Sequence, residues 1–108
     1  MKPIAVYEQQ ARNDYKQSPK SAVYWVVIAS YLYYIRDESI LSDEVFDKIM
    51  KVILDKQIKH SKVSHLITDD DLRAGSLFRL KVKDYPDFIV DQAERIIRGT
   101  YVFRGEEH

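Results

Sequence analysis

The chain has 108 residues, 45% of them hydrophobic and 31% charged, a composition typical of one globular domain and not of a disordered segment. Its 17 basic residues balance its 17 acidic ones, which argues against a general nucleic-acid or anionic-membrane binder, because such proteins carry a basic excess. The absence of cysteine excludes disulfides, thiolate metal sites and a cysteine nucleophile, and it favours a reducing, cytoplasmic location.

Two helices are predicted in the first third of the chain. The first lies at about residues 3–16, and "QSPKS" ends it, with Ser18 as N-cap and Pro19 as the first residue of the next helix. The second, at about 19–36, is apolar on nearly all sides and should be central; a buried strand is the alternative, which its length and proline start disfavour. Its apolar run of about 14 residues is shorter than the roughly 20 needed to span a membrane. The inner stripe of the first helix consists of Ile4, Tyr7, Ala11 and Tyr15.

A third helix should begin after Ser42, which is a good N-cap, and run to about residue 58. Asp43 and Glu44 then lie in its first turn, where the helix dipole favours negative charge. Its apolar face consists of Phe46, Ile49, Met50, Ile53 and Leu54.

Two more helices are predicted in the second half. Thr68 and Asp71 form a capping-box pattern before a helix at about 69–80, although Gly75 weakens that prediction. The last helix begins at Pro86 and ends at Gly99. The apolar residues assigned to the two inner faces are Leu72, Leu77, Phe78 and Leu80, then Phe88, Ile89, Ala93, Ile96 and Ile97. The tail from 99 to 108 is expected either to dock through Tyr101 and Phe103 or to fray. The predicted fold class is therefore all-α, a compact bundle of about five helices in one domain, 1–108.

Sequence motifs for catalysis are absent. There is no lysine in a K-x-D-G setting, no glycine-rich phosphate loop, and no H-E-x-x-H or G-x-S-x-G motif. His60 and His65 lie in a polar connector without patterned acids, and we interpret them as solvated and not as metal ligands. We therefore predict no catalytic residue, no metal site and no enzymatic activity.

The stretch "YLYYIRDESILSDEVFDKIM" concentrates tyrosines and carboxylates where the second and third helices meet. Tyr33 and Tyr34 end one helix, while Asp43 and Asp47 share a face of the next with Phe46 between them. A small concavity with aromatic walls and two carboxylates is expected there. Carboxylates accept hydrogen bonds from sugar hydroxyls and amides, and aromatic faces stack on planar or cationic rings.

An ordinary helix junction is the alternative interpretation of the same residues. Asp43 would then only complement the helix dipole, and Asp47 would pair with Lys51 one turn later in the favoured acid-first order. Tyrosines near a helix end commonly bury the ring and leave the hydroxyl in water.

The stretch "YLYYIRDESILSDEVFD" resembles, without gaps, the N-terminal Ia domain of NAD-dependent DNA ligases, and the likeness covers about residues 23–58. In that family the domain is a helical module that grips the nicotinamide mononucleotide (NMN) half of NAD. The ligase pattern "YY…D.P.ISD.EYD" corresponds here to Tyr33, Tyr34, Asp37, Ile40, Asp43, Phe46 and Asp47. The resemblance implies that the ligand contacts fall on Tyr33, Tyr34, Asp43, Phe46 and Asp47.

The chain departs from the family at several points. Phe46 replaces a tyrosine and loses its hydroxyl, Tyr34 stands where histidine is common, and Ser39 replaces the turn proline. Adenylation, OB and helix-hairpin-helix domains are absent from this sequence, so on its own it is not expected to join DNA. The resemblance implies a nucleotide-binding site at most, or a helical scaffold whose pocket is repurposed.

Phosphate contacts are expected from basic residues outside the ligase-like stretch, because arginine binds phosphate bidentately and lysine acts as a point charge. A solvated basic face that balances the acids at 69–71 is the alternative. The candidates are Arg36, Arg73, Arg79, Lys81 and Lys83.

The leading hypothesis is a small non-catalytic protein that binds NMN, NAD, ADP-ribose or a cyclic ADP-ribose-like signal as a ligand and not as a cofactor. A free-standing module of this kind would suit an accessory protein, viral for example, that sequesters a host-defence nucleotide in the host cytoplasm. The main alternative is a protein-interaction module, such as an inhibitor of a host protein, in which tyrosines form a hot spot or a dimer face. Two further alternatives are an enzyme with Asp43 or Asp47 as general base, and DNA binding through the local basic stretches.

Overall fold

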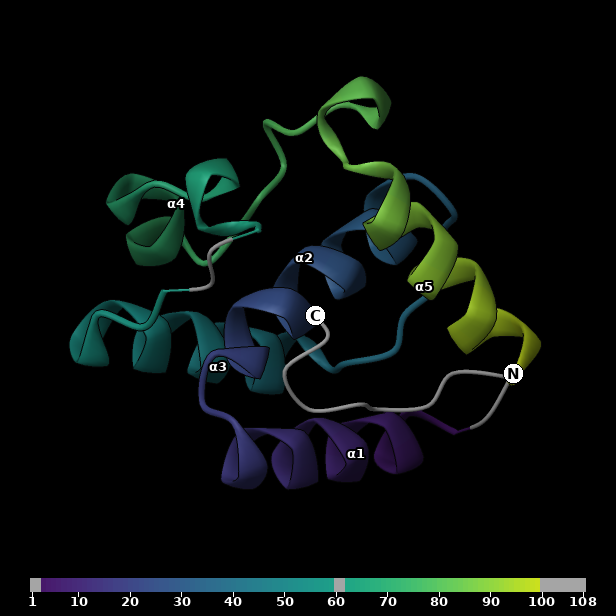
Figure 1. The fold of residues 1–108 in the computed structure, drawn as a ribbon, viewed down its shortest axis with the longest axis horizontal. Coiled ribbons are helices and arrows are strands. Elements are labelled where there is room, and N and C mark those ends of the chain that lie inside the picture. The colour runs from purple at the N-terminus through teal and green to yellow at the C-terminus, as the bar shows by residue number, and fades with distance from the viewer. Residues whose placement is uncertain (1–2, 60–61, 100–108) are drawn as a thin grey trace.

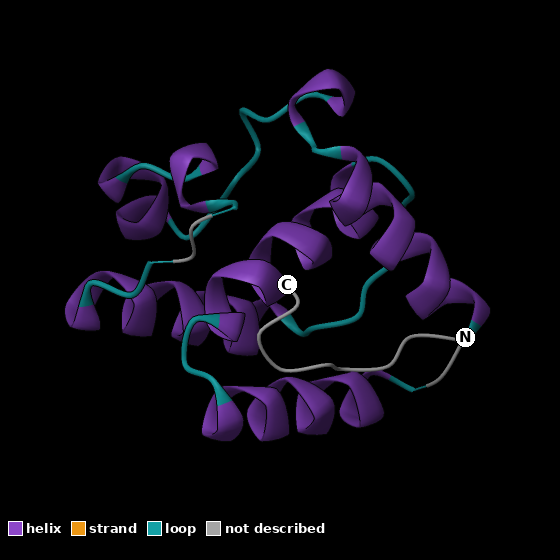
Figure 2. Cartoon of the chain, in the orientation of Figure 1, coloured by secondary structure: helices purple, strands orange, loops and turns teal. Residues whose placement is uncertain are grey.

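A computed structural model of the protein describes residues 3–59 and 62–99. The helices are α1 (Ile4–Gln17), α2 (Ser21–Tyr34), α3 (Asp43–Lys56), α4 (Asp69–Ala74) and α5 (Asp87–Arg98), with two short 3-10 helices, η1 (Ser64–Leu66) and η2 (Val82–Asp84). Within these residues the chain forms helices and loops and no strand, as Figure 2 shows. The predicted all-α class is confirmed.

Helix α2 lies at the centre of the molecule, with α1, α3 and α5 packed against it, whereas α4 packs against α3 (Figure 1). Every residue from Ser21 to Leu32 is buried. A helix that is apolar on all sides needs neighbours on all sides, and burial of its side chains is the main stabilising contribution of this fold. The sequence-based expectation of a central second helix therefore holds.

Buried polar groups join α2 to its neighbours. Trp25 Nε1 donates to Asp14 Oδ2 at 2.7 Å, which links α2 to α1. The hydroxyls of Ser30 and Tyr85 lie 2.8 Å apart and link α2 to the segment before α5. Because a buried polar group without a partner is costly, these bonds fix how the helices meet. The apolar stripe predicted for the first helix did not reveal the role of Asp14.

The predicted helix caps are largely observed. Ser42 Oγ accepts from the Val45 N–H at 3.3 Å, and Thr68 and Asp71 form the expected capping box. Gly99 ends α5 in the left-handed conformation at φ 78°. These local signals explain why three helix boundaries could be placed from the sequence.

Two predicted boundaries are wrong. The fourth helix does not reach residue 80 but stops at Ala74, because Gly75 adopts φ 69° and closes it as a left-handed cap. Leu77 and Leu80 are still buried, from a loop, whereas Phe78 is 68% exposed and belongs to no inner face. Ser18 is the C-cap of α1 and not an N-cap: the Ser21 N–H donates to the Ser18 carbonyl at 2.9 Å, so a turn separates the two helices.

The remaining expectations concern the ends of the inner stripes and the connector. Ile4 is 36% exposed, so the stripe of α1 effectively begins one turn later. His65 is exposed, as expected of a solvated histidine. His60, Tyr101 and Phe103 lie outside the described residues.

Candidate functional site

The turn between α2 and α3 is held by two hydrogen bonds and by a left-handed residue. The Glu38 N–H donates to the Leu32 carbonyl at 2.8 Å, which folds the turn back on the end of α2. Asp37 takes a left-handed conformation, φ 55°, which aspartate tolerates better than most residues. The Ser42 N–H donates to Glu8 Oε2 at 2.7 Å, which ties the start of α3 to α1. The start of α3 is thereby positioned next to the end of α2.

A hollow of about 240 Å³, here called the junction hollow, opens at this helix junction. All five ligand-contact residues implied by the ligase resemblance line it, two from α2 and three from α3. Gly75, the cap of α4, completes the wall, a residue that sequence reasoning did not place there. The lining residues are Ala29, Ser30, Tyr33, Tyr34, Ser39, Ile40, Leu41, Asp43, Phe46, Asp47 and Gly75.

The two tyrosines of the junction hollow form a chain of edge-to-face contacts with Phe78, which lies outside its lining. The rings of Tyr33 and Tyr34 have centroids 5.0 Å apart at 76°, and those of Tyr34 and Phe78 are 5.4 Å apart at 79°. The hydroxyl of Tyr34 lies 3.1 Å from that of Ser76, which holds the half-buried ring in place. Tyr33 is 50% exposed, so one ring of this chain stays open to a stacking partner.

The two carboxylates differ in their surroundings. Asp43 is exposed in the first turn of α3, next to the helix N-terminus. Asp47 Oδ2 lies 3.0 Å from Lys51 Nζ, which is the ion pair of the alternative interpretation. A Cβ placed on Gly75 would come within 2.6 Å of Asp47 Oδ1, so the second oxygen faces the α4 cap. No cation is among the described residues that line the junction hollow. Its lining therefore offers hydrogen-bond acceptors and aromatic faces.

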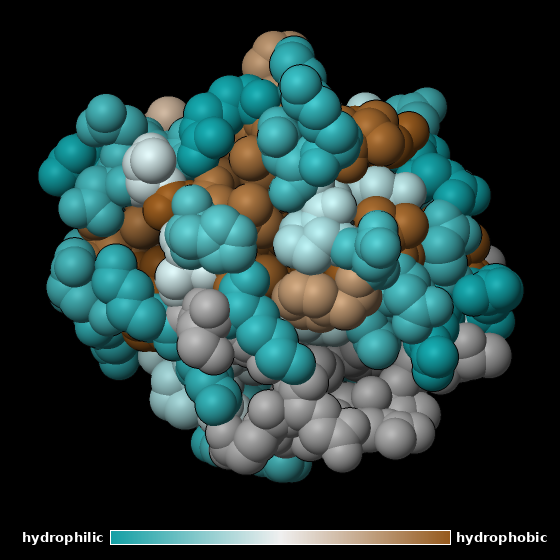
Figure 3. All heavy atoms as spheres, turned by 45° about the horizontal axis from the view of Figure 1, so that its top comes forward, coloured by the Kyte–Doolittle hydropathy of each residue, from teal (hydrophilic) through white to brown (hydrophobic). Residues whose placement is uncertain are grey.

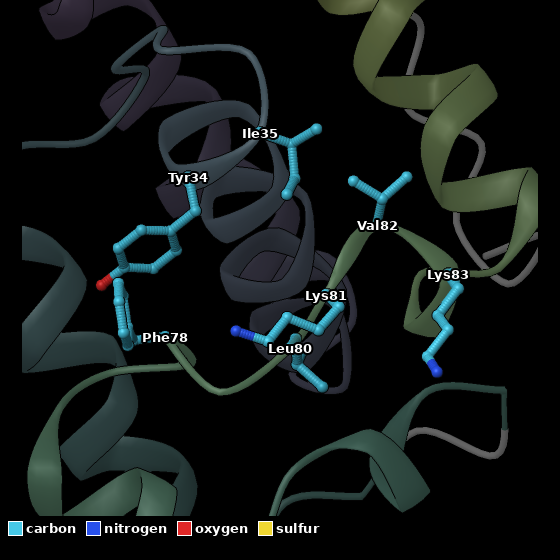
Figure 4. Close-up of a pocket in the computed structure, with 7 residues that line it drawn as sticks. All are labelled: Tyr34, Ile35, Phe78, Leu80, Lys81, Val82 and Lys83. Carbon is cyan, nitrogen blue, oxygen red and sulfur yellow. The ribbon is translucent and has the colours of Figure 1, made fainter.

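A second hollow, here called the basic hollow, is also lined by Tyr34 and measures about 470 Å³. Two of the five phosphate candidates, Lys81 and Lys83, line it (Figure 4). Lys81 extends toward Phe78, with Nζ 5.9 Å from the ring centroid. Figure 3, which brings the top of Figure 1 forward, shows apolar surface among hydrophilic residues on that face of the molecule. The full lining is Tyr34, Ile35, Phe78, Leu80, Lys81, Val82 and Lys83.

The three arginine candidates lie outside both hollows and have carboxylate partners. Arg36 donates to Glu94 of α5, and this hydrogen bond raises the pKa of its guanidinium. Arg73 lies 3.2 Å from Asp70, one turn away on α4. The structure thus brings only lysines of the predicted phosphate set to the hollows.

Arg79 forms the most extensive of these contacts. Its Nε lies 2.9 and 3.0 Å from the two carboxylate oxygens of Asp71, and its Nη2 donates to the Leu66 carbonyl at 2.7 Å. Burial raises the pKa of Asp71, whereas the hydrogen bonds from Arg79 and Thr68 together lower it by a larger amount. The pKa of Asp71 is therefore depressed below its ordinary value. This clasp joins α4 to η1 and has a structural role.

Within residues 3–59 and 62–99, no three histidine, aspartate or glutamate side chains gather into a metal-binding cluster. No helix in the described part of the chain has the length and hydrophobicity needed to cross a membrane. Comparison with known proteins found no matching family model, no matching curated protein and no matching solved structure. The likeness to the ligase Ia domain stays a prediction.

Proposed function

We propose that the protein binds a nucleotide derived from NAD, with the nicotinamide ring and its ribose in the junction hollow. The observation that carries this proposal is the convergence of Tyr33, Tyr34, Asp43, Phe46 and Asp47 on one hollow of about 240 Å³. Pockets for drug-sized ligands span about 300–1,000 Å³, so this hollow suits a base with its sugar and not a whole dinucleotide.

Charge favours the oxidised nicotinamide ring over other bases. The junction hollow has two carboxylates in its lining: Asp47, which pairs with Lys51 from outside the lining, and Asp43, which has no ion pair among the described residues. Aromatic faces and carboxylates both attract a pyridinium cation, whereas a neutral adenine gains only stacking. The carboxylates also accept hydrogen bonds from ribose hydroxyls.

The phosphate would lie outside the junction hollow, because the Asp43 carboxylate, which has no ion pair among the described residues, repels it there. The basic hollow shares Tyr34 with the junction hollow and has Lys81 and Lys83 in its lining. A nucleotide monophosphate that extends past Tyr34 into the basic hollow would therefore meet a lysine. This division of charge supports NMN, or the NMN half of NAD, as the ligand.

The test is calorimetric titration of the protein with NMN, reduced NMN, NAD, ADP-ribose and cyclic ADP-ribose. Reduced NMN has nearly the same shape as NMN but an uncharged ring, so NMN is expected to bind about fivefold more tightly, the scale of one partly exposed charge pair. Asp43→Asn should remove that preference, and Glu44→Gln, on the same helical turn but outside the hollow, should keep it. No heat with any of the five ligands would refute the proposal.

The phosphate half of the proposal has its own test. Lys81→Met should weaken binding of NMN and leave binding of nicotinamide riboside, which lacks the phosphate, unchanged. Equal losses for both ligands would remove Lys81 from the phosphate site.

If the protein binds the nucleotide without converting it, its function would be sequestration. A viral accessory protein of this kind would withhold a host-defence nucleotide from the host. NAD incubated with the protein is expected to be recovered intact by chromatography. Release of a product would favour the enzymatic alternative, with Asp43 or Asp47 as general base.

A second candidate function, a protein-interaction surface, is favoured by the exposure of Phe78 at 68% and Tyr33 at 50% beside the hollows. The two functions separate by mutation. Phe78→Ser should abolish capture of a protein partner. Binding of nicotinamide riboside should persist in this variant, because that ligand lacks the phosphate assigned to the basic hollow, which Phe78 lines, and Ser76 still holds the Tyr34 hydroxyl.

A further inference from the structure

A third hollow lies between α1 and α3, on a different side of α2 from the basic hollow, and measures about 420 Å³. We call it the apolar groove. Its interior is formed by Tyr15, Trp25, Val45, Ile49 and Val52, with small residues, Ala11 and Ala22, at its base. It shares no residue with the junction hollow or the basic hollow. A ligand in the apolar groove would therefore contact none of the residues on which the nucleotide proposal depends.

Four cations surround this apolar interior. Arg12 and Lys16 reach its rim from α1, and Lys48 and Lys56 reach it from α3. All four are exposed, and no carboxylate among the described residues forms an ion pair with any of them. The one acid in the lining, Glu8, is engaged with the Ser42 N–H at 2.7 Å. In a chain with zero net charge, this is a local excess of positive charge around apolar surface.

We propose that the apolar groove binds an amphipathic anion of the fatty-carboxylate class. The hydrocarbon chain would lie over Trp25, Ile49 and Val52, where it leaves water, and the carboxylate would meet the lysines and arginine of the rim. The lining residues extend over about 12 Å along α1 and about 16 Å along α3, at 1.5 Å per helical residue. An elongated, medium-chain ligand fits this shape better than a compact one.

The protein contains its own reporter, because Trp25 is the single tryptophan and lies in the groove lining. Its fluorescence in the full-length protein should change saturably on titration with laurate. Dodecanol and dodecylamine have the same hydrocarbon chain with a neutral and a cationic head, so the expected order of affinity is laurate, then dodecanol, then dodecylamine. Equal affinities, the reverse order, or no change with any of the three would overturn the proposal. A response to an acidic amphipathic peptide but not to laurate would also overturn it and assign the groove to a protein helix.

A matched pair of variants tests the rim. Lys48→Met combined with Lys56→Met should lower laurate affinity about fivefold and leave dodecanol affinity unchanged, since exposed charge contacts are of that size. Lys59→Met, just beyond α3 and outside the groove lining, should leave both unchanged. Unchanged laurate binding in the double variant would refute the assignment. NMN should not alter Trp25 fluorescence, because Trp25 does not line the junction hollow, so the two proposals succeed or fail separately.

Discussion

Asp47 contacts two neighbouring residues of the fold and also lines the proposed ligand site. One carboxylate oxygen pairs with Lys51 at 3.0 Å, and the other faces Gly75 across a gap that a methyl group would close. The ion pair is half-exposed and contributes little to stability by itself. The ion pair orients the Asp47 carboxylate toward the cap of α4. Because Gly75 has no side chain, α4 can approach the junction hollow closely at this point.

This arrangement predicts different outcomes for two glycine substitutions. Gly75→Ala and Gly99→Ala both place a Cβ at positive φ, 69° and 78°, and should each lower the free energy of unfolding by about 1 kcal/mol. Only the alanine at 75 would touch Asp47, since nothing lies within 4 Å of a Cβ at Gly99. Urea unfolding and NMN titration of both variants check this.

We expect Gly75→Ala to displace the Asp47 carboxylate and weaken NMN binding, while Gly99→Ala binds like the unaltered protein. The stability cost at the two sites should be similar, because a flexible carboxylate can move aside. Equal NMN affinity in both variants would mean that Asp47 does not contact the ligand.

At the scale of elements, α4 is the helix that most needs tertiary support. It has six residues, fewer than the roughly 12–15 below which an isolated helix is marginal in water. The capping box of Thr68 and Asp71 satisfies its first turn, and Arg79 clasps Asp71 from the loop that follows. Gly75, and with it one wall of the junction hollow, is held in place by this short helix.

The clasp predicts a pH dependence. The folded-state pKa of Asp71 is depressed, so its stabilising effect is present above the ordinary pKa of about 3.9 and is lost as the pH falls toward the folded-state value. Asp71→Asn should lower the free energy of unfolding by about 2 kcal/mol at pH near 7, through loss of a cap and of charged hydrogen bonds. It should also make the decline of stability below pH about 4 shallower.

Urea unfolding at neutral and acidic pH measures both effects. Asp70→Asn is the matched control, because its side chain is 94% exposed and its pair with Arg73 should contribute little. An Asp71→Asn variant whose acid decline matches that of Asp70→Asn would contradict the role given to the clasp.

At the scale of the whole molecule, the core around α2 contains phenols. Burial raises the pKa of Tyr24 above its ordinary value, with a further contribution from Asp91. Burial likewise raises the pKa of Tyr85, although its hydrogen bond with Ser30 opposes this. Both groups keep their proton in the folded state, where an anion would be costly.

Alkaline denaturation should follow from these shifts. The unfolded-state pKa of tyrosine is about 10, so the stabilising effect is complete below that pH and is lost as the pH rises toward the higher folded-state value. Phenolate absorbance should show that Tyr24 and Tyr85 ionise together with unfolding. Tyr24→Phe should make the alkaline loss of stability shallower, and Tyr33→Phe, at the 50% exposed ring, should not. An unchanged alkaline profile in Tyr24→Phe would show that its ionisation is not coupled to unfolding.

The sequence by itself determined the all-α class, the order of the helices, most of their boundaries and the first half of the candidate site. Apolar periodicity and the caps at Ser42, Thr68 and Gly99 are local signals, because each depends on residues a few positions apart. Tyr33 and Asp47 line one hollow because a single short turn joins the helices that carry them. Only the tertiary structure decided which distant residues meet: Gly75 and Ser76 at the site, Arg79 at Asp71, and Trp25 at Asp14. Those contacts depend on how helices pack around α2, and packing over long separations leaves no period in the sequence.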